Sequence, residues 1–344
     1  MPATITKNSC RDIMKPLIKM LLVSASLGAM ATAAHAQMSI DTSKTIKVAM
    51  VPKLIGLSVF KANEQGAIEA AKSLNINFLY TGPVTASAQG QVDIINSLVA
   101  RKFDAITVTS NNPTELAPSL KRAMAQGIAV VSYDSDVSPD ARDFFIQNTA
   151  YPAMGKALVD SVEAYAGPNA QVAILSSTPD AAIQNAWLGA VKTYMAATYP
   201  NMKVVTTQYG QSSPSLSLSA GLNILHAYPQ VTAIIAPDGA AEVGAAAAIE
   251  KLGMQGKVFA TGASDPNSIR QYVKDGVIKA SPLWDEVGEG KLVMYVARLA
   301  ANHALKPDDT FTVPGLGTYT VNNKVIIFSE PLVFTAENID KYNF

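Results

Sequence analysis

Apolar and polar positions follow two periods that alternate along this chain. Short β-branched apolar runs, such as 45–51 and 103–110, predict strands that are buried on both faces. Stretches with helical spacing, such as 66–75 and 115–127, come between them. Strands that alternate with amphipathic helices are typical of a parallel sheet with crossover helices. The pattern therefore predicts an α/β fold.

The alternation restarts after about residue 147 and continues through a second set of strands and helices. Residues 286–305 predict a further helix, and 310–328 alternates like a hairpin with Gly315 and Gly317 at its turn. No long linker or low-complexity segment separates the two halves. We therefore expect two α/β units in tandem, closely joined.

The N-terminus has the pattern of an export signal. Four basic residues precede an apolar stretch at 20–34 that is too short to span a bilayer. Ala34-His35-Ala36 then fits a small-x-small cleavage site. We expect 1–36 to be a Sec-type signal peptide and the mature protein to lie in the periplasm.

Composition narrows the possible functions of the mature chain. The only cysteine, Cys10, lies within the expected signal peptide, which excludes disulfides and thiolate sites from the mature protein. Removal of 1–36 leaves 23 basic and 26 acidic residues, a net charge of −3. This balance gives no electrostatic attraction to nucleic acid or to an anionic membrane. We expect a soluble exported protein that binds no nucleic acid.

Polar residues follow nearly every predicted strand. Asp134 and Asp136 come after the apolar run 128–131, and the same pattern recurs at Lys53, Ser110-Asn111-Asn112, Ser176-Ser177, Pro237-Asp238 and Ser264-Asp265. In parallel α/β sheets, ligands bind outside the carboxyl ends of the strands. Taken singly, each of these residues fits helix capping better than ligand binding. Their recurrence in both halves predicts a polar ligand site, with Asp134 in contact with the ligand and Asp136 orienting Lys53 or capping the next segment.

Two other kinds of site fit the sequence less well. Asp134 and Asp136 could form a metal site or an acid–base pair, but Ser138-Pro139 indicates that the strand does not continue. Neither mature histidine, His226 or His303, has a partner at metal-ligand spacing. No glycine motif has the spacing of a phosphate loop or a dinucleotide-binding turn. We expect no enzyme activity, no metal and no cofactor.

Several segments of the mature chain match one known family. They are VAMVPKLIGLSVF, YTGPVTASAQGQVDIINSLVARKFDAITV, LKRAMAQGIAVVSYDSDV, QNAWLGAVK, VVTTQYG, TAIIAPDG, PLWD and the closing ENIDKYNF. Together they resemble the sugar-type (type I) periplasmic binding proteins of ABC importers. The similarity is closest to the branch of autoinducer-2 receptors and rhamnose-binding proteins, and it covers the whole mature chain.

The resemblance implies two doubly wound parallel-sheet lobes, joined by a three-stranded hinge, that close over a ligand. The hinge strands would lie at about 147–150, 282–286 and 328–332. The N-terminal lobe would comprise 45–147 plus 285–328, and the C-terminal lobe 148–284 plus 329–344.

The resemblance also implies ligand-binding residues. Autoinducer-2 receptors hold their ligand with a lysine, two aspartates, a glutamine and an Ala-Pro-Asp-Ala turn. Lys53 matches the lysine, Asp134 the first aspartate and Gln184 the glutamine. Pro237 matches the proline of the turn.

Two positions depart from the receptors' pattern. Ile183 replaces the second aspartate, and Gly239 stands where the receptors have alanine. Loss of the aspartate removes a charged acceptor for a ligand hydroxyl. A deoxy sugar, another pentose or a polyol therefore fits this sequence as well as autoinducer-2 does.

The residue types also suit a sugar without reference to the family. A carboxylate accepts hydrogen bonds from neighbouring hydroxyls, and a lysine or amide donates in return. Phe60 and Trp284 could pack against the C–H face of a sugar ring, although Phe60 fits core packing equally well. Asp265 is a further candidate contact, whereas Trp187 fits the core.

These observations predict a receptor that binds a small sugar and delivers it to an ABC permease in the inner membrane. We expect the receptor to be a monomer. Two alternatives stay open: an autoinducer-2 receptor for uptake of the quorum signal, and a sensor that presents its ligand to a chemoreceptor or kinase.

Overall fold

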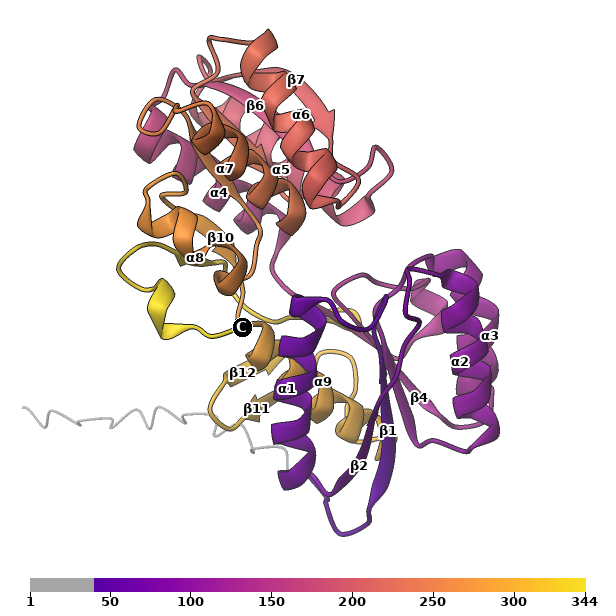
Figure 1. Cartoon of the computed structure of the whole chain (residues 1–344). Helices are drawn as coiled ribbons and strands as arrows, with labels where there is room; N and C mark the ends of the chain where they lie inside the picture. Colours follow the sequence, from indigo (N-terminus) through magenta and orange to yellow (C-terminus); the bar gives the residue numbers. More distant parts are fainter. Residues whose placement is uncertain (1–39) are drawn as a thin grey trace, which may run out of the picture. The chain divides into compact units, whose positions relative to one another are not determined.

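The computed structural model describes residues 40–344, and the signal peptide expected at 1–36 lies outside these residues. Two parallel sheets with helices packed on their faces form the core (Figure 1). This architecture confirms the predicted α/β class with doubly wound sheets.

The first sheet has six parallel strands in the order β13-β5-β4-β3-β1-β2. These strands are β1 (Ile46–Val51), β2 (Ile76–Tyr80), β3 (Ala105–Val108), β4 (Ala129–Tyr133), β5 (Phe144–Gln147) and β13 (Val325–Ile327). The helices associated with it are α1 (Ser58–Ser73), α2 (Ala88–Ala100), α3 (Pro113–Ala125) and α9 (Glu286–Ala301). α1 packs against α9, and α2 packs against α3.

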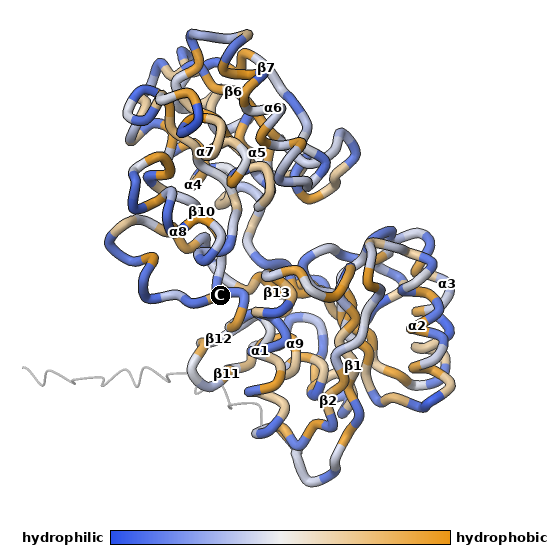
Figure 2. The backbone as a smooth tube through the Cα atoms, in the orientation of Figure 1, coloured by the Kyte–Doolittle hydropathy of each residue, from blue (hydrophilic) through white to orange (hydrophobic). Residues whose placement is uncertain are grey.

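The sequence of β1 explains why this sheet is covered on both faces. Val48 and Met50 pack in the cluster that includes α1 and α9, whereas Ala49 and Val51 pack with α2 and α3. Successive side chains of a strand point to opposite faces, so a strand buried on both faces must be apolar at consecutive positions. Figure 2 shows β1 largely in the hydrophobic colour.

Two glycines allow α1 and α9 to approach closely. A Cβ atom on Gly66 would lie 1.8 Å from the Val287 carbonyl oxygen, and one on Gly290 would lie 2.0 Å from the Asn63 carbonyl oxygen. Any larger residue at either position would force the two helices apart. The N-terminal turns of α9, which carry several buried polar side chains, are therefore held tightly against α1.

The second sheet has four parallel strands in the order β7-β6-β8-β9. These strands are β6 (Gln171–Ser176), β7 (Lys203–Tyr209), β8 (Ala233–Ala236) and β9 (Phe259–Gly262). Its helices are α4 (Tyr151–Ala166), α5 (Ala182–Thr198), α6 (Pro214–Ala227), α7 (Gly239–Lys251) and α8 (Pro266–Lys274). α4 packs against α5, and α6 packs against α7.

The chain passes between the two sheets at three places. It leaves the first sheet after β5, returns through 284–285 into α9, and leaves again after β13. Beside these passages, β10 (Ser281–Leu283) pairs with β14 (Leu332–Phe334) in antiparallel fashion. The passages coincide with the segments expected to form the hinge.

The hairpin expected over 310–328 is shorter than predicted. β11 (Thr310–Val313) and β12 (Gly317–Thr320) form it, with Gly315 and Gly317 at positive φ in the turn. β13 instead joins the edge of the six-stranded sheet, parallel to β5. Pairing between segments so far apart in the chain leaves no local signal in the sequence. Among residues 40–344, no helix is both long and apolar enough to cross a membrane.

Candidate functional site

Asp134 and Lys53 meet at the carboxyl edge of the six-stranded sheet. Lys53 follows β1 and Asp134 follows β4, and their Nζ and Oδ2 atoms lie 3.1 Å apart. Thr109 Oγ1 donates to Asp134 Oδ2 at 2.9 Å, and Lys53 Nζ also donates to Ser135 Oγ. The side chains of Lys53 and Asp134 are 27% and 12% exposed. A charged acceptor and a charged donor therefore stand together where solvent reaches them.

The backbone of Asp134 adopts a conformation that few residue types tolerate. Its φ is +56°, in the left-handed region, where Asp and Asn are several-fold enriched among non-glycine residues. This conformation ends β4 and turns the side chain toward Lys53 and Thr109. An aspartate at this position thus serves the backbone as well as the site.

A buried glutamine that the sequence analysis missed supports this edge. Gln91 on α2 donates from Nε2 to the carbonyl oxygens of Pro52 and Thr109, at 3.0 and 2.7 Å, and accepts from the Asn111 N–H at 3.0 Å. Asn111 Nδ2 in turn donates to the Lys53 carbonyl oxygen at 2.7 Å. Gln91 therefore joins the ends of β1 and β3. A sequence signal existed, because Gln91 occupies the buried stripe of its helix together with Ile95 and Leu98.

Asp136 pairs with a residue that the sequence analysis did not name, although its Oδ1 also accepts from the Val137 N–H at 2.8 Å, where the next segment starts. Arg142 donates to it in a bidentate pair, from Nε to Oδ1 at 2.7 Å and from Nη2 to Oδ2 at 2.8 Å. Ser135, not Asp136, contacts Lys53. The Arg142 side chain is only 5% exposed, and an ion is retained at such a place only with a partner. Asp136 is a structural ion-pair residue, and only Ser135 separates it from the candidate site residue Asp134.

The second sheet presents Pro237 and Gly239 at its own carboxyl edge. Pro237 is buried after β8, and Gly239 is the first residue of α7. Asp238 caps that helix by accepting from the Ala241 N–H at 3.0 Å. Ser264 Oγ donates to the Gly239 carbonyl oxygen at 2.9 Å. The turn after β8 is thus fixed by a helix cap and by the neighbouring strand end.

Asp265 is engaged by other protein groups. It caps α8 by accepting from the Ser268 N–H at 2.9 Å, and its Oδ2 accepts from Ser268 Oγ at 2.9 Å and Ser58 Oγ at 2.8 Å. Ser58 is the first residue of α1, which packs on the other sheet. In this structure Oδ1 of Asp265 caps α8, and Oδ2 links α8 to α1.

Gln184 and Ile183 lie at the start of α5, and both are half-buried. Ile183 packs against the main hydrophobic cluster. No hydrogen bond of the Gln184 side chain joins it to the part of the chain that the structure describes. Trp187, one turn further along α5, is buried as the sequence indicated.

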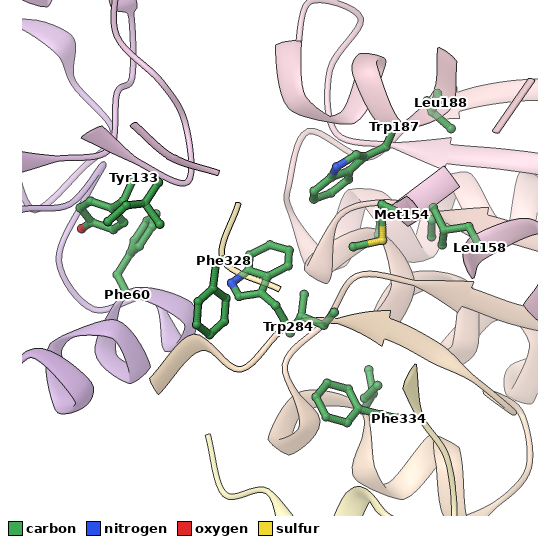
Figure 3. Packing of buried hydrophobic residues seen from close by; sticks show 14 of the residues in the cluster. Phe60, Tyr133, Met154, Leu158, Trp187, Leu188, Trp284, Phe328 and Phe334 are labelled. Carbon is green, nitrogen blue, oxygen red and sulfur yellow. The ribbon is translucent and has the colours of Figure 1, made fainter. Parts of the chain in front are cut away.

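The two aromatic candidates are both buried, with Phe60 3% and Trp284 4% exposed. The Trp284 ring lies against Trp187, with centroids 6.1 Å apart and planes inclined by 59° (Figure 3). The Trp284 indole N–H donates to Glu289 Oε2 at 3.0 Å. For Phe60, this burial agrees with the core-packing alternative.

Three fully buried glutamates, Glu242, Glu286 and Glu289, also escaped the sequence analysis. Burial raises the pKa of Glu242 and of Glu289 to about 8. It raises the pKa of Glu286 well above the usual range, and the nearby Asp265 adds to this effect. Asp134 raises the pKa of Glu289 further. For Glu286 and Glu289 the sequence held a signal, because both acids lie on one face of the otherwise apolar stretch that forms α9.

Comparison with known proteins shows which family this chain belongs to. Residues 48–304 match the model of the periplasmic binding protein domain. The chain belongs to this family.

Two solved structures and one curated protein illustrate the similarity. A sugar ABC transporter protein from Actinomyces odontolyticus is 31% identical, with a TM-score of 0.80 over 89% of this chain and 100% of that one. LsrB from Clostridium saccharobutylicum, solved in complex with AI-2, is 28% identical, with a TM-score of 0.79 over 87% of this chain and 100% of that one. The D-ribose/D-allose-binding protein of Pseudomonas aeruginosa is 24% identical over 70% of this chain and 77% of that protein.

These similarities define the general role of this protein. It is a sugar-binding periplasmic component of an ABC transporter. Its relatives are substrate-binding proteins, not enzymes.

Proposed function

We propose that this protein is exported by the signal peptide 1–36 and acts as a monomeric receptor for one small sugar, which it delivers to the ABC permease of the inner membrane. The Lys53–Asp134 pair carries the proposal, since it places a partly exposed donor and acceptor at the strand ends where the fold binds ligands. The two lobes would be 45–147 plus 285–328 and 148–284 plus 329–344.

The pair suits the chemistry of sugar hydroxyls. Each hydroxyl can donate to Asp134 and accept from Lys53, and hydrogen bonds to charged groups are stronger than those between neutral groups. Gln184, Pro237 and Gly239 would complete the site from the second lobe, and Gln184 has an amide available for such contacts. A ligand held by both lobes binds the closed form more tightly and so favours closure.

Three further candidate residues could contact the ligand only after part of the protein moves. Phe60 and Trp284 are buried in this structure, so a sugar ring would reach them only after the surrounding segments rearrange. Asp265 would have to exchange its bond with Ser58 for one with the ligand. Trp284 is well placed for such a change, because it lies in a passage between the two sheets.

We infer a nutrient sugar as the ligand, such as a deoxyhexose or a pentose. Ile183 supports this inference, because its apolar side chain offers no acceptor where autoinducer-2 receptors have an aspartate. The resemblance to rhamnose-binding proteins points the same way. Autoinducer-2 is the second candidate, and the complex of LsrB from Clostridium saccharobutylicum with AI-2 favours it.

A thermal-shift screen of residues 37–344 tests the proposal. The panel would hold L-rhamnose, other deoxyhexoses, pentoses, tetritols and autoinducer-2. A ligand that binds only the native state raises stability by RT ln(1 + [L]/Kd), which is about 2.7 kcal/mol at a hundredfold excess over Kd. We expect one sugar to shift Tm and autoinducer-2 not to. A shift with autoinducer-2 alone would contradict the nutrient assignment, and no shift with any compound would contradict the sugar receptor itself.

Ile183→Asp tests the specificity at that position. The added carboxylate should move the preference of the protein toward the more hydroxylated furanose, autoinducer-2. Ile183→Asn is the matched control, because it is polar and of similar size but uncharged. An unchanged ligand profile in Ile183→Asp would show that this residue does not face the ligand.

A further inference from the structure

Trp284 is hydrogen-bonded to α9 of the first sheet, and α1 supports the accepting residue. Its indole N–H donates to Glu289 Oε2 at 3.0 Å, and Glu289 lies in the first turns of α9. Asn63 of α1 donates from Nδ2 to the same oxygen at 3.2 Å and to the Glu286 carbonyl oxygen at 2.8 Å. All four of these residues are almost completely buried. The direction of the indole N–H bond is therefore fixed by one carboxyl oxygen.

Trp284 also lies against α5 of the second sheet. Trp187 of α5 is the aromatic neighbour, with ring centroids 6.1 Å apart (Figure 3). This contact is apolar and has no fixed direction comparable to a hydrogen bond. Trp284 also directly follows β10 in one of the passages between the sheets. Its orientation thus depends on a polar contact to α9 and on ring packing to α5.

Glu289 is suited to be a lasting acceptor for the indole. A buried N–H without an acceptor is costly, and Glu289 Oε2 is the partner of the Trp284 N–H among residues 40–344. The raised pKa of Glu289, about 8, means that the acid is mostly neutral at pH 7. A neutral carboxyl still accepts two N–H bonds through one oxygen, and it avoids placing a second buried negative charge near Asp134.

We propose that Glu289 is a positioning residue of the sugar site, which keeps the Trp284 indole in one orientation while the segment 284–285 changes shape during ligand binding. The proposal rests on the proposed function, in which Trp284 contacts the sugar. Glu289 itself does not touch the ligand. It acts by ensuring that the face of Trp284 is presented without an entropic cost on binding.

A purely structural role for Glu289 is the competing explanation. In that case Glu289 would only stabilise the packing of α1 against α9. Glu286 provides the matched control, because it lies one turn earlier on α9 and is equally buried. The Glu286 carboxyl makes no hydrogen bond to either tryptophan, and its Oε2 has no partner among residues 40–344. Replacing Glu286 perturbs the same helix without removing the indole's acceptor.

The experiment compares Glu289→Gln, Glu289→Leu and Glu286→Leu by near-UV circular dichroism and by calorimetric titration. The titrant is whichever panel sugar gives the wild type its largest thermal shift. The chain has only two tryptophans, so the tryptophan bands at the long-wavelength end of the near-UV spectrum report on Trp284 and Trp187, and Trp284→Phe assigns the share of Trp284. Glutamine keeps the accepting oxygen, whereas leucine keeps only the approximate size.

We expect Glu289→Gln to keep the near-UV spectrum and to keep Kd within about twofold, because a hydrogen-bond acceptor remains. Glu289→Leu should change the Trp284 bands and weaken binding by about tenfold or more, because the buried N–H loses its partner. Glu286→Leu should change Tm while leaving the spectrum and Kd as in the wild type.

Three results would overturn the proposal. A wild-type spectrum in Glu289→Leu would show that the acid does not orient the indole. Equal loss of affinity in Glu289→Leu and Glu286→Leu would assign the effect to helix packing. Equal loss in Glu289→Gln and Glu289→Leu would show that the carboxyl group matters for another reason. If no sugar bound the wild type, the proposed function would fail, and the spectra alone would still decide whether Glu289 orients Trp284.

Discussion

Replacing Asp134 by asparagine separates its proposed role in binding from its role in the backbone. Asparagine tolerates the left-handed conformation at φ +56° nearly as well as aspartate, so Asp134→Asn should leave the turn after β4 intact. Alanine would add backbone strain and confuse the two effects. The substitution removes the negative charge and one accepting oxygen, while the neighbours Lys53 and Thr109 remain.

The expected loss of affinity is large and the expected loss of stability is small. Removing one partner of a desolvated, charged hydrogen-bonded pair costs about 2–5 kcal/mol of binding free energy, or about 30-fold to several thousandfold in Kd. In the absence of ligand, Lys53 is 27% exposed, so water solvates it when the carboxylate is lost. The free energy of unfolding should therefore fall by no more than about 1 kcal/mol.

Asp136→Asn is the matched control and should give the opposite result. Asp136 pairs with Arg142, whose side chain is 5% exposed, so the substitution leaves a buried guanidinium without its carboxylate. Breaking such a pair costs about 3–5 kcal/mol of stability. Because Asp136 contacts neither Lys53 nor Asp134, the folded fraction should bind sugar as the wild type does.

Calorimetric titration and chemical denaturation of both variants form the assay. The titrant is the sugar found in the thermal-shift screen. Wild-type affinity in Asp134→Asn would remove Asp134 from the site. Loss of affinity in both variants, at concentrations where both are folded, would mean that the two acids act as one unit and that the division between them is wrong.

Three further predictions concern stability. Since the folded protein raises the pKa of Glu242 and Glu289 to about 8, these two acids retain protons that the unfolded chain releases above about pH 4.5. Their contribution to stability should therefore be complete below that pH and fall as the pH rises toward 8, by up to about 1.4 kcal/mol per pH unit for each acid. Urea titrations at several pH values should show this slope, and Glu242→Gln should reduce it; an unchanged slope would count against the raised pKa of Glu242. Gly290→Ala should lower the free energy of unfolding by about 1–3 kcal/mol in the same assay, because its Cβ would lie 2.0 Å from the Asn63 carbonyl oxygen, and an unchanged value would show that α1 and α9 separate freely. Gly239→Ala should change stability by less than about 0.5 kcal/mol, since the nearest atom to its Cβ, the Ala263 carbonyl oxygen, is 3.7 Å away, and a larger loss would reveal strain at the start of α7.

The sheets could be predicted from the sequence because their strands are covered on both faces. The consecutive apolar residues of 45–51 and 103–110 correspond closely to β1 and β3. β13 could not be assigned in this way, because its place beside β5 depends on pairing between residues such as Val325 and Phe145. Local patterns identify strands but not their distant neighbours.

The candidate site likewise contains residues that the sequence predicted and residues that it did not. The rule that ligands bind at strand carboxyl ends, with the family resemblance, directed attention to Lys53 and Asp134, and these two side chains do meet. The partners Gln91 and Arg142 were missed, because each acts on a segment that only the folded chain brings near. Asp265 shows the converse, since a polar residue at a strand end turned out to cap a helix and to contact Ser58.

The position of β13 at the edge of the six-stranded sheet has a consequence for how the protein folds. Phe144, Phe145 and Ile146 of β5 gain their outer neighbour only when 325–327 arrives, after the whole second sheet has been synthesised. Until then β5 is an open edge rich in aromatic side chains, the kind of segment that pairs with other chains. The first sheet is therefore completed only after the second half of the chain has been made, and the long sequence separation between β5 and β13 raises the contact order, which predicts slow folding. A chain truncated before residue 325 should consequently aggregate, even though every residue named in the proposed sugar site would be present.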